Sequence, residues 1–309
     1  MHQSYYKQNT ALLAQLPVFY QPWYLDTIGI PWEVLIHEEQ GEPVLIWVYS
    51  KEKKGPFCFN RAQAAYFQIM CGPYFLKELP EAEKLRIIHT TYSKLPRATF
   101  EQYLPICSQN IDQFFASRHF EIVPKITHII DLSLPIEEIY QQIKTKRRKK
   151  IEKGLRELSI VARPIQPQMA HAWMNQAIQK NKGRISFTAH QFAKLQENAI
   201  NNGASFSLEA RNQDNELVAV LWTLYDQQAM YNLVSALNYD IMNSYAISAM
   251  LWKAIEKARE LGLRYFDFEG SKIPGVAELY RSFGATVIQY NSFQKTNSLL
   301  WKLKRQLLG

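Results

Sequence analysis

The stretch that decides the fold is LGLRYFDFEGSKIPGVAELYRSFGATVIQY, residues 261–290. Aromatic and acidic residues alternate from Tyr265 to Glu269, which is the period of a β-strand. A helical turn opens at Pro274 and ends at Gly284, and a second run of strand-forming residues follows it. The stretch therefore predicts a strand, a loop, a short helix and a strand in close succession.

Three side chains in this stretch can carry chemistry. Asp267 and Glu269 share one face of the predicted strand, and Tyr280 lies on the helix that follows. A carboxylate can remove a proton from an acceptor, and a phenol can return one to a leaving group. The alternatives are a core tyrosine and carboxylates that pair with Lys272 or Arg281. We expect the three side chains to converge on one site.

Tyr280, followed four residues later by Gly284 and then by a strand, resembles the closing motif of the GNAT acyltransferase superfamily. In that motif a tyrosine often protonates the leaving thiolate. The wider string resembles the Fem family of aminoacyl-transferring peptidyltransferases, which pair two GNAT-like domains. The resemblance implies an N-acyltransferase that moves an acyl or aminoacyl group onto an amine acceptor. It implies catalytic roles for Tyr280, Asp267 and Glu269, and a substrate contact at Ser271.

Length and composition favour two globular domains. The chain has 309 residues, of which 47% are hydrophobic and 21% charged. No run approaches the roughly 18 apolar residues of a membrane span, and the amino terminus lacks the pattern of a signal peptide. We therefore expect a cytoplasmic protein. The three cysteines and seven scattered histidines fit no metal or redox spacing, so we expect neither disulfides nor a metal.

The order of predicted elements indicates an α+β fold with two GNAT-like domains, each a mixed, mostly antiparallel sheet flanked by helices. Residues 1–131 are expected to form a degenerate N-terminal GNAT-like domain, and residues 132–309 the C-terminal domain with the active site. The second half should run helix, strand, helices, three antiparallel strands, helix, strand, helix and strand. This is the order of elements in a GNAT domain. The expectation of a second, N-terminal GNAT-like domain follows from the resemblance to the Fem family.

Most of the net charge of +8 lies in one short block. An apolar stripe predicts a single long helix from Ile136 to Leu158, and within it residues 144–157 hold eight basic and two acidic residues, which leaves only +2 for the rest of the chain. Such a block indicates an anionic partner, either a phosphate-bearing donor, tRNA, an anionic acceptor or an acidic membrane. The usual alternative is a solvated helix face. Because Arg147 falls on the apolar stripe, we expect it to bind an anionic group together with Arg148 and Lys146.

The segment LNYDIMNSYAI, residues 237–247, opens another predicted helix. In GNAT proteins the pyrophosphate of acyl-CoA lies on backbone N–H groups at the amino end of this helix, usually through a glycine-rich basic loop. The present segment has neither glycine nor arginine. Asn243, Ser244 and Tyr245 can cap the helix and are the expected donor-binding residues. Both acyl-CoA and aminoacyl-tRNA, the donor of the Fem group, stay open.

The carboxy end, SLLWKLKRQLL, is basic and amphipathic. It is compatible with peripheral contact at a membrane, although docking onto the protein body is the expectation for so short a segment. Three functions stay open: an N-acyltransferase, a catalytically silent GNAT-like fold that binds a ligand, and a nucleic-acid-binding protein that works through its basic helix. Only the first accounts for Asp267, Glu269 and Tyr280 together.

Overall fold

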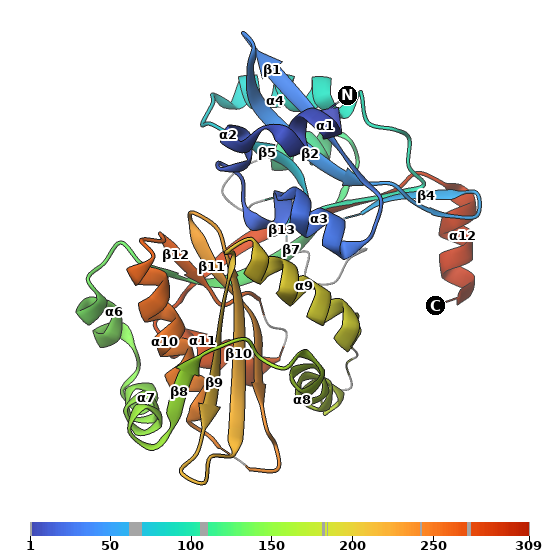
Figure 1. The fold of residues 1–309 in the computed structure, drawn as a ribbon. Helices are drawn as coiled ribbons and strands as arrows, with labels where there is room; N and C mark the ends of the chain where they lie inside the picture. Colours follow the sequence, from blue (N-terminus) through green and yellow to red (C-terminus); the bar gives the residue numbers. More distant parts are fainter. Residues whose placement is uncertain are drawn as a thin grey trace. The chain divides into compact units, whose positions relative to one another are not determined.

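The computed structural model describes residues 2–61, 70–105, 111–180, 183, 185–241, 243–270 and 273–308. The chain forms two compact units, and Figure 1 labels their elements. Unit 1 consists of Met1–Lys125 and Gln289–Gly309, and unit 2 consists of Ile126–Ile288. The chain passes between the units inside β7 (Glu121–Asp131) and again inside β13 (Thr286–Thr296).

The carboxy end of the chain belongs to unit 1, unlike the predicted second domain of residues 132–309. The second half of β13 pairs antiparallel with β6 (Phe100–Tyr103), and Phe293 lies opposite Tyr103. Residues 289–309 therefore pack with the first part of the chain. Strand pairing between segments so far apart leaves no local pattern, so the elements read in chain order do not reveal this return.

Unit 1 is built around an aromatic core. Trp47 has its ring centroid 5.3 Å from that of Tyr103, 5.8 Å from Tyr92, 6.3 Å from Phe114 and 6.4 Å from Phe115. The strands pair in the orders β1-β2-β5 and β3-β4-β6-β13. Their bounds are β1 (Trp32–Glu39), β2 (Glu42–Ser50), β3 (Glu52–Lys54), β4 (Phe57–Arg61) and β5 (Gly72–Phe75). The helices are α1 (His2–Gln8), α2 (Thr10–Leu13), η1 (Val18–Tyr20), α3 (Pro22–Ile28), α4 (Glu81–Tyr92), α5 (Asp112–Ser117) and α12 (Leu299–Leu308).

Unit 2 is a sheet with helices on both faces. The strand order is β7-β12-β11-β10-β9-β8, and all pairs are antiparallel except β11 with β12. The strands are β8 (Ser159–Ala162), β9 (Ser205–Arg211), β10 (Leu217–Tyr225), β11 (Ala229–Leu237) and β12 (Tyr265–Asp267). The helices are α6 (Ile136–Gln142), α7 (Thr145–Glu157), α8 (Pro167–Gln179), α9 (Ala189–Asn201), α10 (Ala246–Glu260) and α11 (Pro274–Arg281).

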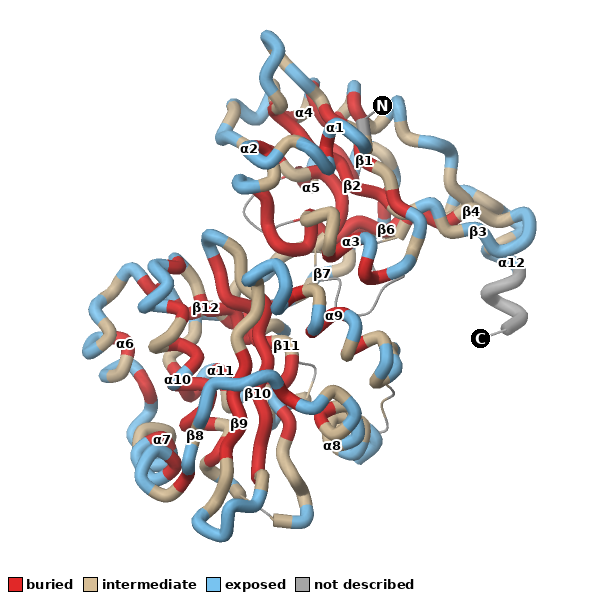
Figure 2. The backbone as a smooth tube through the Cα atoms, viewed as in Figure 1, coloured by how far each residue is buried: buried red, intermediate tan, exposed pale blue. Residues whose placement is uncertain are grey.

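The two faces of this sheet pack against different helices. Alternate residues of the central strands, among them Leu221 and Phe266, join one buried cluster with residues of α6, α7, α10 and α11. On the other face Trp222 lies edge-on to Phe192 of α9, with ring centroids 5.2 Å apart. Figure 2 shows the central strands as the most continuously buried part of unit 2. The predicted α+β fold and its GNAT-like element order are confirmed.

Residues 261–290 fold as predicted, into β12, α11 and β13, and Gly284 follows α11 with a φ of 79°. The single long helix predicted from Ile136 to Leu158 is wrong, because the structure has two helices, α6 and α7. Ile143 and Lys144 interrupt them with extended backbone, and the Lys144 N–H donates to the carbonyl oxygen of Ser282 at 2.9 Å. Tertiary packing holds this break, although the apolar spacing runs through it.

Candidate active site at the end of β12

Asp267 is the last residue of β12, and its carboxylate is buried. Its Oδ1 accepts hydrogen bonds from the hydroxyl of Thr127 on β7 and from the backbone N–H of Glu269, the latter at 2.7 Å. No lysine, arginine or histidine within the described ranges forms an ion pair with it. A buried carboxylate of this kind is stabilised by dipoles alone, which is an expensive arrangement for a charge.

Glu269 follows in a tight turn. Its backbone has a φ of 65°, a conformation that costs a non-glycine residue on the order of 1 kcal/mol. At the next position, a Cβ on Gly270 would lie 2.2 Å from the carbonyl oxygen of Ile126, so only glycine fits there. The Oε1 atom of Glu269 is buried and has no hydrogen-bond partner in the described structure. The turn thus holds a second carboxyl group in a dry environment.

Burial of the two carboxyl groups changes their protonation. It raises the pKa of Asp267 from 3.8 to about 6, although the bonds from Thr127 and from the Glu269 N–H oppose the shift. Burial also raises the pKa of Glu269 well above its usual value of 4.5, and the negative charge of Asp267 adds to this. Burial and mutual repulsion thus disfavour two negative charges in this pair.

Tyr280, on α11, packs against the other face of the sheet from Asp267. Its ring stacks on Phe268, with centroids 4.8 Å apart, and Phe268 and Asp267 point to opposite faces because side chains alternate along a strand. Burial raises the pKa of Tyr280, the charges of Glu269 and Asp267 raise it further, and a hydrogen bond with Asn232 opposes them. The charges of the carboxyl pair therefore raise the pKa of the phenol from the opposite face of the sheet.

The sheet also opens at this point. The parallel strands β11 and β12 pair over only three residues, and the last pair is Tyr231 with Asp267. β11 then continues to Leu237 without β12 beside it. Asn232, the first residue beyond the paired part, is buried and reaches Tyr280.

His128 belongs to the same cluster, and sequence reasoning missed it. Its ring lies edge-on to Tyr280 with centroids 5.5 Å apart, is fully buried, and forms no hydrogen bond of ordinary length and angle at either nitrogen among the described residues. Burial lowers the pKa of His128, the backbone of Glu269 opposes this shift, and the charge of Arg281 adds to it. The sequence does contain a signal for this position. His128 alternates with Ile126 and Ile130, so it lies on the same side of the strand as these apolar residues.

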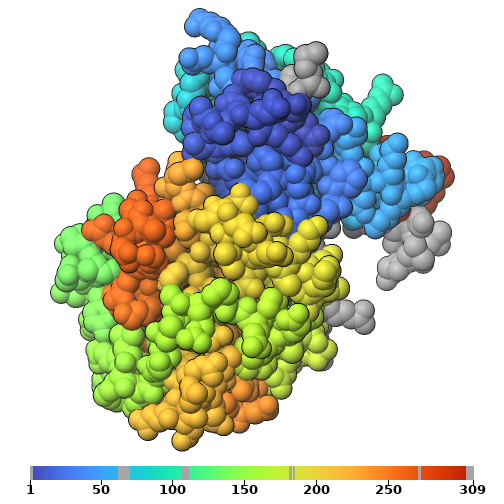
Figure 3. Space-filling view, in the orientation of Figure 1, coloured from blue at the N-terminus to red at the C-terminus, as the bar shows by residue number. Residues whose placement is uncertain are grey.

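The predicted anion-binding residues lie on α7, at the surface of unit 2 (green in Figure 3). Arg147 is half-buried, and its Nε and Nη1 atoms donate to the hydroxyls of Ser282 at 2.8 Å and Ser248 at 2.6 Å. Those hydrogen bonds join α7 to α10 and to the end of α11. Arg148 lies over the ring of Tyr140, and Lys146 is exposed. Binding of an anion by these three basic residues stays a prediction.

The predicted donor-binding residues precede α10. The Asn243 Oδ1 atom accepts hydrogen bonds from the backbone N–H groups of Tyr245 at 3.1 Å and Ala246 at 2.8 Å. The Ser244 carbonyl accepts from Lys150 at 3.3 Å, and the Tyr245 hydroxyl donates to Glu157. Two N–H groups at the amino end of α10 are thus already capped by a side chain. Ser271, the remaining predicted site residue, lies outside the described residues.

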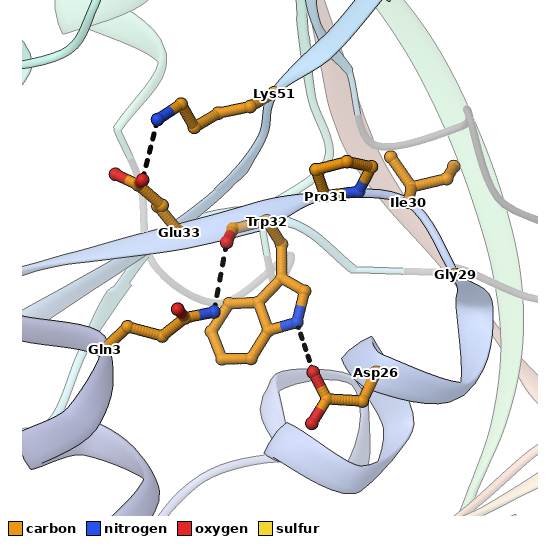
Figure 4. Close-up of a pocket in the computed structure, with 8 residues that line it drawn as sticks. All are labelled: Gln3, Asp26, Gly29, Ile30, Pro31, Trp32, Glu33 and Lys51. Atoms are coloured by element: carbon orange, nitrogen blue, oxygen red, sulfur yellow. Dashed lines mark hydrogen bonds and ion pairs between the residues drawn. The ribbon is translucent and has the colours of Figure 1, made fainter.

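A cavity of about 510 Å³ lies elsewhere, in unit 1 (Figure 4). Its polar groups bind one another: the Trp32 indole donates to Asp26 at 2.9 Å, the Gln3 amide donates to the Trp32 carbonyl, and Lys51 pairs with Glu33. The remaining lining residues are Gly29, Ile30 and Pro31. It holds none of the predicted site residues and leaves no polar group to receive a substrate.

The described residues contain neither a metal site nor a membrane-spanning helix. No cluster of three or more histidine, cysteine, aspartate or glutamate side chains in the described ranges is placed to hold a metal ion. In the same ranges no helix has the length and apolar character needed to cross a membrane.

The carboxyl pair predicts how folding stability depends on pH. Because both pKa values are higher in the folded than in the unfolded protein, the native state binds more protons above pH 3.8, and the free energy of unfolding falls as the pH rises from about 4 through 6. Replacing both residues, Asp267→Asn with Glu269→Gln, should flatten this slope in urea titrations at a series of pH values. The matched change of two exposed carboxylates, Asp214→Asn with Glu137→Gln, should leave it intact; an unchanged slope in the first variant would contradict the burial argument.

The unpartnered histidine gives a second prediction. His128→Phe should raise the melting temperature, because an apolar ring replaces an imidazole whose nitrogens lost water without gaining partners, an effect of roughly 1–2 kcal/mol. His171→Phe is the control, since the Nε2 atom of His171 lies 2.9 Å from the Phe187 carbonyl oxygen and that hydrogen bond would be lost. Calorimetry of both variants checks the contrast. A lower melting temperature for His128→Phe would mean that the imidazole has a partner.

Comparison with known proteins identifies the fold. Residues 140–278 match the family model described as an acetyltransferase (GNAT) domain, which ends two residues before Tyr280. A search of curated protein sequences found no match.

Solved structures with similar folds cover nearly the whole chain. FemX superposes with a TM-score of 0.73 at 11% identity, over 96% of this chain and 98% of that one. The C-terminal domain of a putative lysylphosphatidylglycerol synthetase from Agrobacterium fabrum has a TM-score of 0.58 at 11% identity, over 99% and 96% of the two chains. A tandem GNAT protein from the clavulanic acid biosynthesis pathway has a TM-score of 0.51 at 9% identity, over 85% and 82%. The chain therefore has a Fem-like GNAT fold, and residues 140–278 match the model of a GNAT acetyltransferase domain.

Proposed function

We propose that this chain is an N-acyltransferase that transfers an aminoacyl or acyl group to a primary amine, and that the reaction takes place at the end of β12. One observation carries the proposal: the carboxyl groups of Asp267 and Glu269 lie at the end of β12 with no cationic partner in the described structure, and their charges raise the pKa of the Tyr280 phenol. The match to a GNAT acetyltransferase domain, which includes Asp267 and Glu269, supports it.

The acceptor amine would arrive as an ammonium ion. Its positive charge compensates the negative charge that Asp267 and Glu269 hold without a counter-ion, so the pair favours binding of the ammonium form. The pair takes one proton from the ammonium, directly or through water, and the nitrogen releases its second proton to solvent once the new bond has formed. The free electron pair of the nitrogen then attacks the donor carbonyl carbon, and the bond to the leaving oxygen or sulfur breaks.

Tyr280 would give the leaving group its proton. The negative charge of the carboxyl pair is one cause of its raised pKa, so neutralising that pair with the proton of the amine makes the phenol a stronger acid. The base and the acid are thus linked: Tyr280 becomes competent only after the acceptor has lost its proton. The pair then returns a proton to the phenolate, which restores the starting state.

Aminoacyl-tRNA is the donor that the site favours over acyl-CoA. The Asn243 side chain already occupies two N–H groups at the amino end of α10, where a GNAT protein receives the pyrophosphate of CoA. In addition, Lys146 and Lys149 on α7 are exposed and form no ion pair within the described ranges. Such lysines attract a phosphate backbone. A tRNA donor also fits the cytoplasmic location expected from the sequence.

The mechanism predicts the effect of removing one hydroxyl. Tyr280→Phe should lower kcat by one to three orders of magnitude, because the leaving group loses its acid, while donor affinity is retained. Tyr265→Phe, on β12 but outside the cluster, is the matched control and should keep its activity. Single-turnover transfer to a diamine acceptor measures both. Unchanged transfer by Tyr280→Phe would remove the phenol from the mechanism.

The donor can be tested before the acceptor is known. Aminoacyl-tRNA should raise the melting temperature in a thermal-shift assay, whereas CoA and acetyl-CoA should not. The double variant Lys146→Gln with Lys149→Gln should weaken tRNA binding. It should also reduce the slope of the logarithm of the binding constant against the logarithm of the salt concentration by about two, one for each lost phosphate contact. Lys194→Gln, an exposed lysine on α9, is the control. Stabilisation by acetyl-CoA alone would overturn the choice of donor, and tRNA binding without any transfer would make the chain a nucleic-acid-binding protein.

A further inference from the structure

The α12 helix exposes an unusual amount of apolar surface. Leu299 and Leu300 are each 72% exposed and Leu303 is 49% exposed, which makes them the three most exposed large hydrophobic side chains in the described structure. Residues 299, 300 and 303 lie on one side of a helix. Ser298 begins the helix by accepting the Trp301 N–H at 3.3 Å. An apolar stripe that stays in water on an ordered helix needs a partner.

Trp301 fixes which side of α12 faces outward. Its ring lies 4.9 Å from the rings of both Phe57 and Phe59 on β4, centroid to centroid. Figure 1 shows α12 beside this strand. Because Trp301 projects from the side of the helix away from Leu299 and Leu303, its docking onto β4 turns the leucines away from the protein. The expectation that the carboxy end docks onto the body is thus met by the tryptophan and not by the leucines.

The surroundings of the leucines are positively charged. No aspartate or glutamate occurs between Leu279 and Gly309. Lys302 is exposed beside the leucine stripe. Across the strand pair, Lys54 lies opposite Phe57, on the face that receives Trp301, and pairs with Glu52 at 3.1 Å with its side chain still exposed. Lys53 next to it is exposed and forms no ion pair within the described ranges. Exposed leucines flanked by lysines are the composition of a helix that lies in the interface of an anionic bilayer.

We propose that α12 and the β3–β4 hairpin form a surface that binds an anionic lipid membrane, with the three leucines in the headgroup region and the lysines on lipid phosphates. A second copy of the chain would bury the leucines as well, but protein interfaces are depleted in lysine. A nucleic acid would use the lysines and leave the leucines in water. This surface lies in unit 1, outside residues 140–278, so the proposal does not depend on the acyltransferase function.

Vesicle co-sedimentation tests the proposal on the whole chain. The protein should bind vesicles of phosphatidylcholine with phosphatidylglycerol, and bind pure phosphatidylcholine much more weakly. Leu300→Gln with Leu303→Gln should lower the partition coefficient by about tenfold or more, with an unchanged melting temperature because both side chains are exposed. Lys54→Gln with Lys302→Gln should lower it by about tenfold on the anionic vesicles only.

Ile200→Gln with Leu261→Gln is the matched control, since both side chains are exposed in unit 2 and the change should leave binding intact. Equal binding by the leucine variant and the unchanged protein would overturn the proposal. The membrane proposal would also fail if sedimentation velocity found a dimer that the leucine variant dissociates. It would fail as well if no form of the protein bound vesicles while the lysine variant lost tRNA binding.

Discussion

The structure of the site depends on one constraint: the buried carboxyl group of Asp267 and that of the half-buried Glu269 lie at the end of β12 without a cationic partner in the described structure. Asp267 has only the Thr127 hydroxyl and a backbone N–H, and one oxygen of Glu269 has nothing. A protein interior tolerates one negative charge there only if the second carboxyl keeps its proton. The pair is therefore both a weak base and an incomplete cation site, which is what an ammonium acceptor requires.

The fold creates this constraint by ending a strand early. β12 pairs with β11 over three residues, and the chain then turns through a positive φ at Glu269 and passes so close to Ile126 that Gly270 has no room for a side chain. The strain of the turn and the desolvation of the carboxyl groups cost stability, and the packing of the surrounding sheet and helices offsets that cost. Strained, desolvated groups that gather in one place are typical of functional sites.

The sequence predicted the local elements well and their long-range relations poorly. The alternation around Asp267 and the glycine after α11 were enough to predict β12, α11 and β13, because strand period and helix ends are local properties. The break between α6 and α7 and the return of β13 to unit 1 depend on contacts with distant residues, such as the bond from Lys144 to Ser282. The placement of Tyr280 across the sheet from Asp267, and the part of His128 in the cluster, likewise required the pairing of β7 with β12.

The proton shared by the carboxyl pair can be observed directly. In a ¹³C NMR titration with labelled side-chain carboxyl groups, assigned through Asp267→Asn and Glu269→Gln, the account predicts that Asp267 titrates near pH 6 and Glu269 keeps its proton to higher pH. If both carboxyl groups instead titrate near 4, as they do in water, the pair is not a desolvated base and the account of the site is wrong.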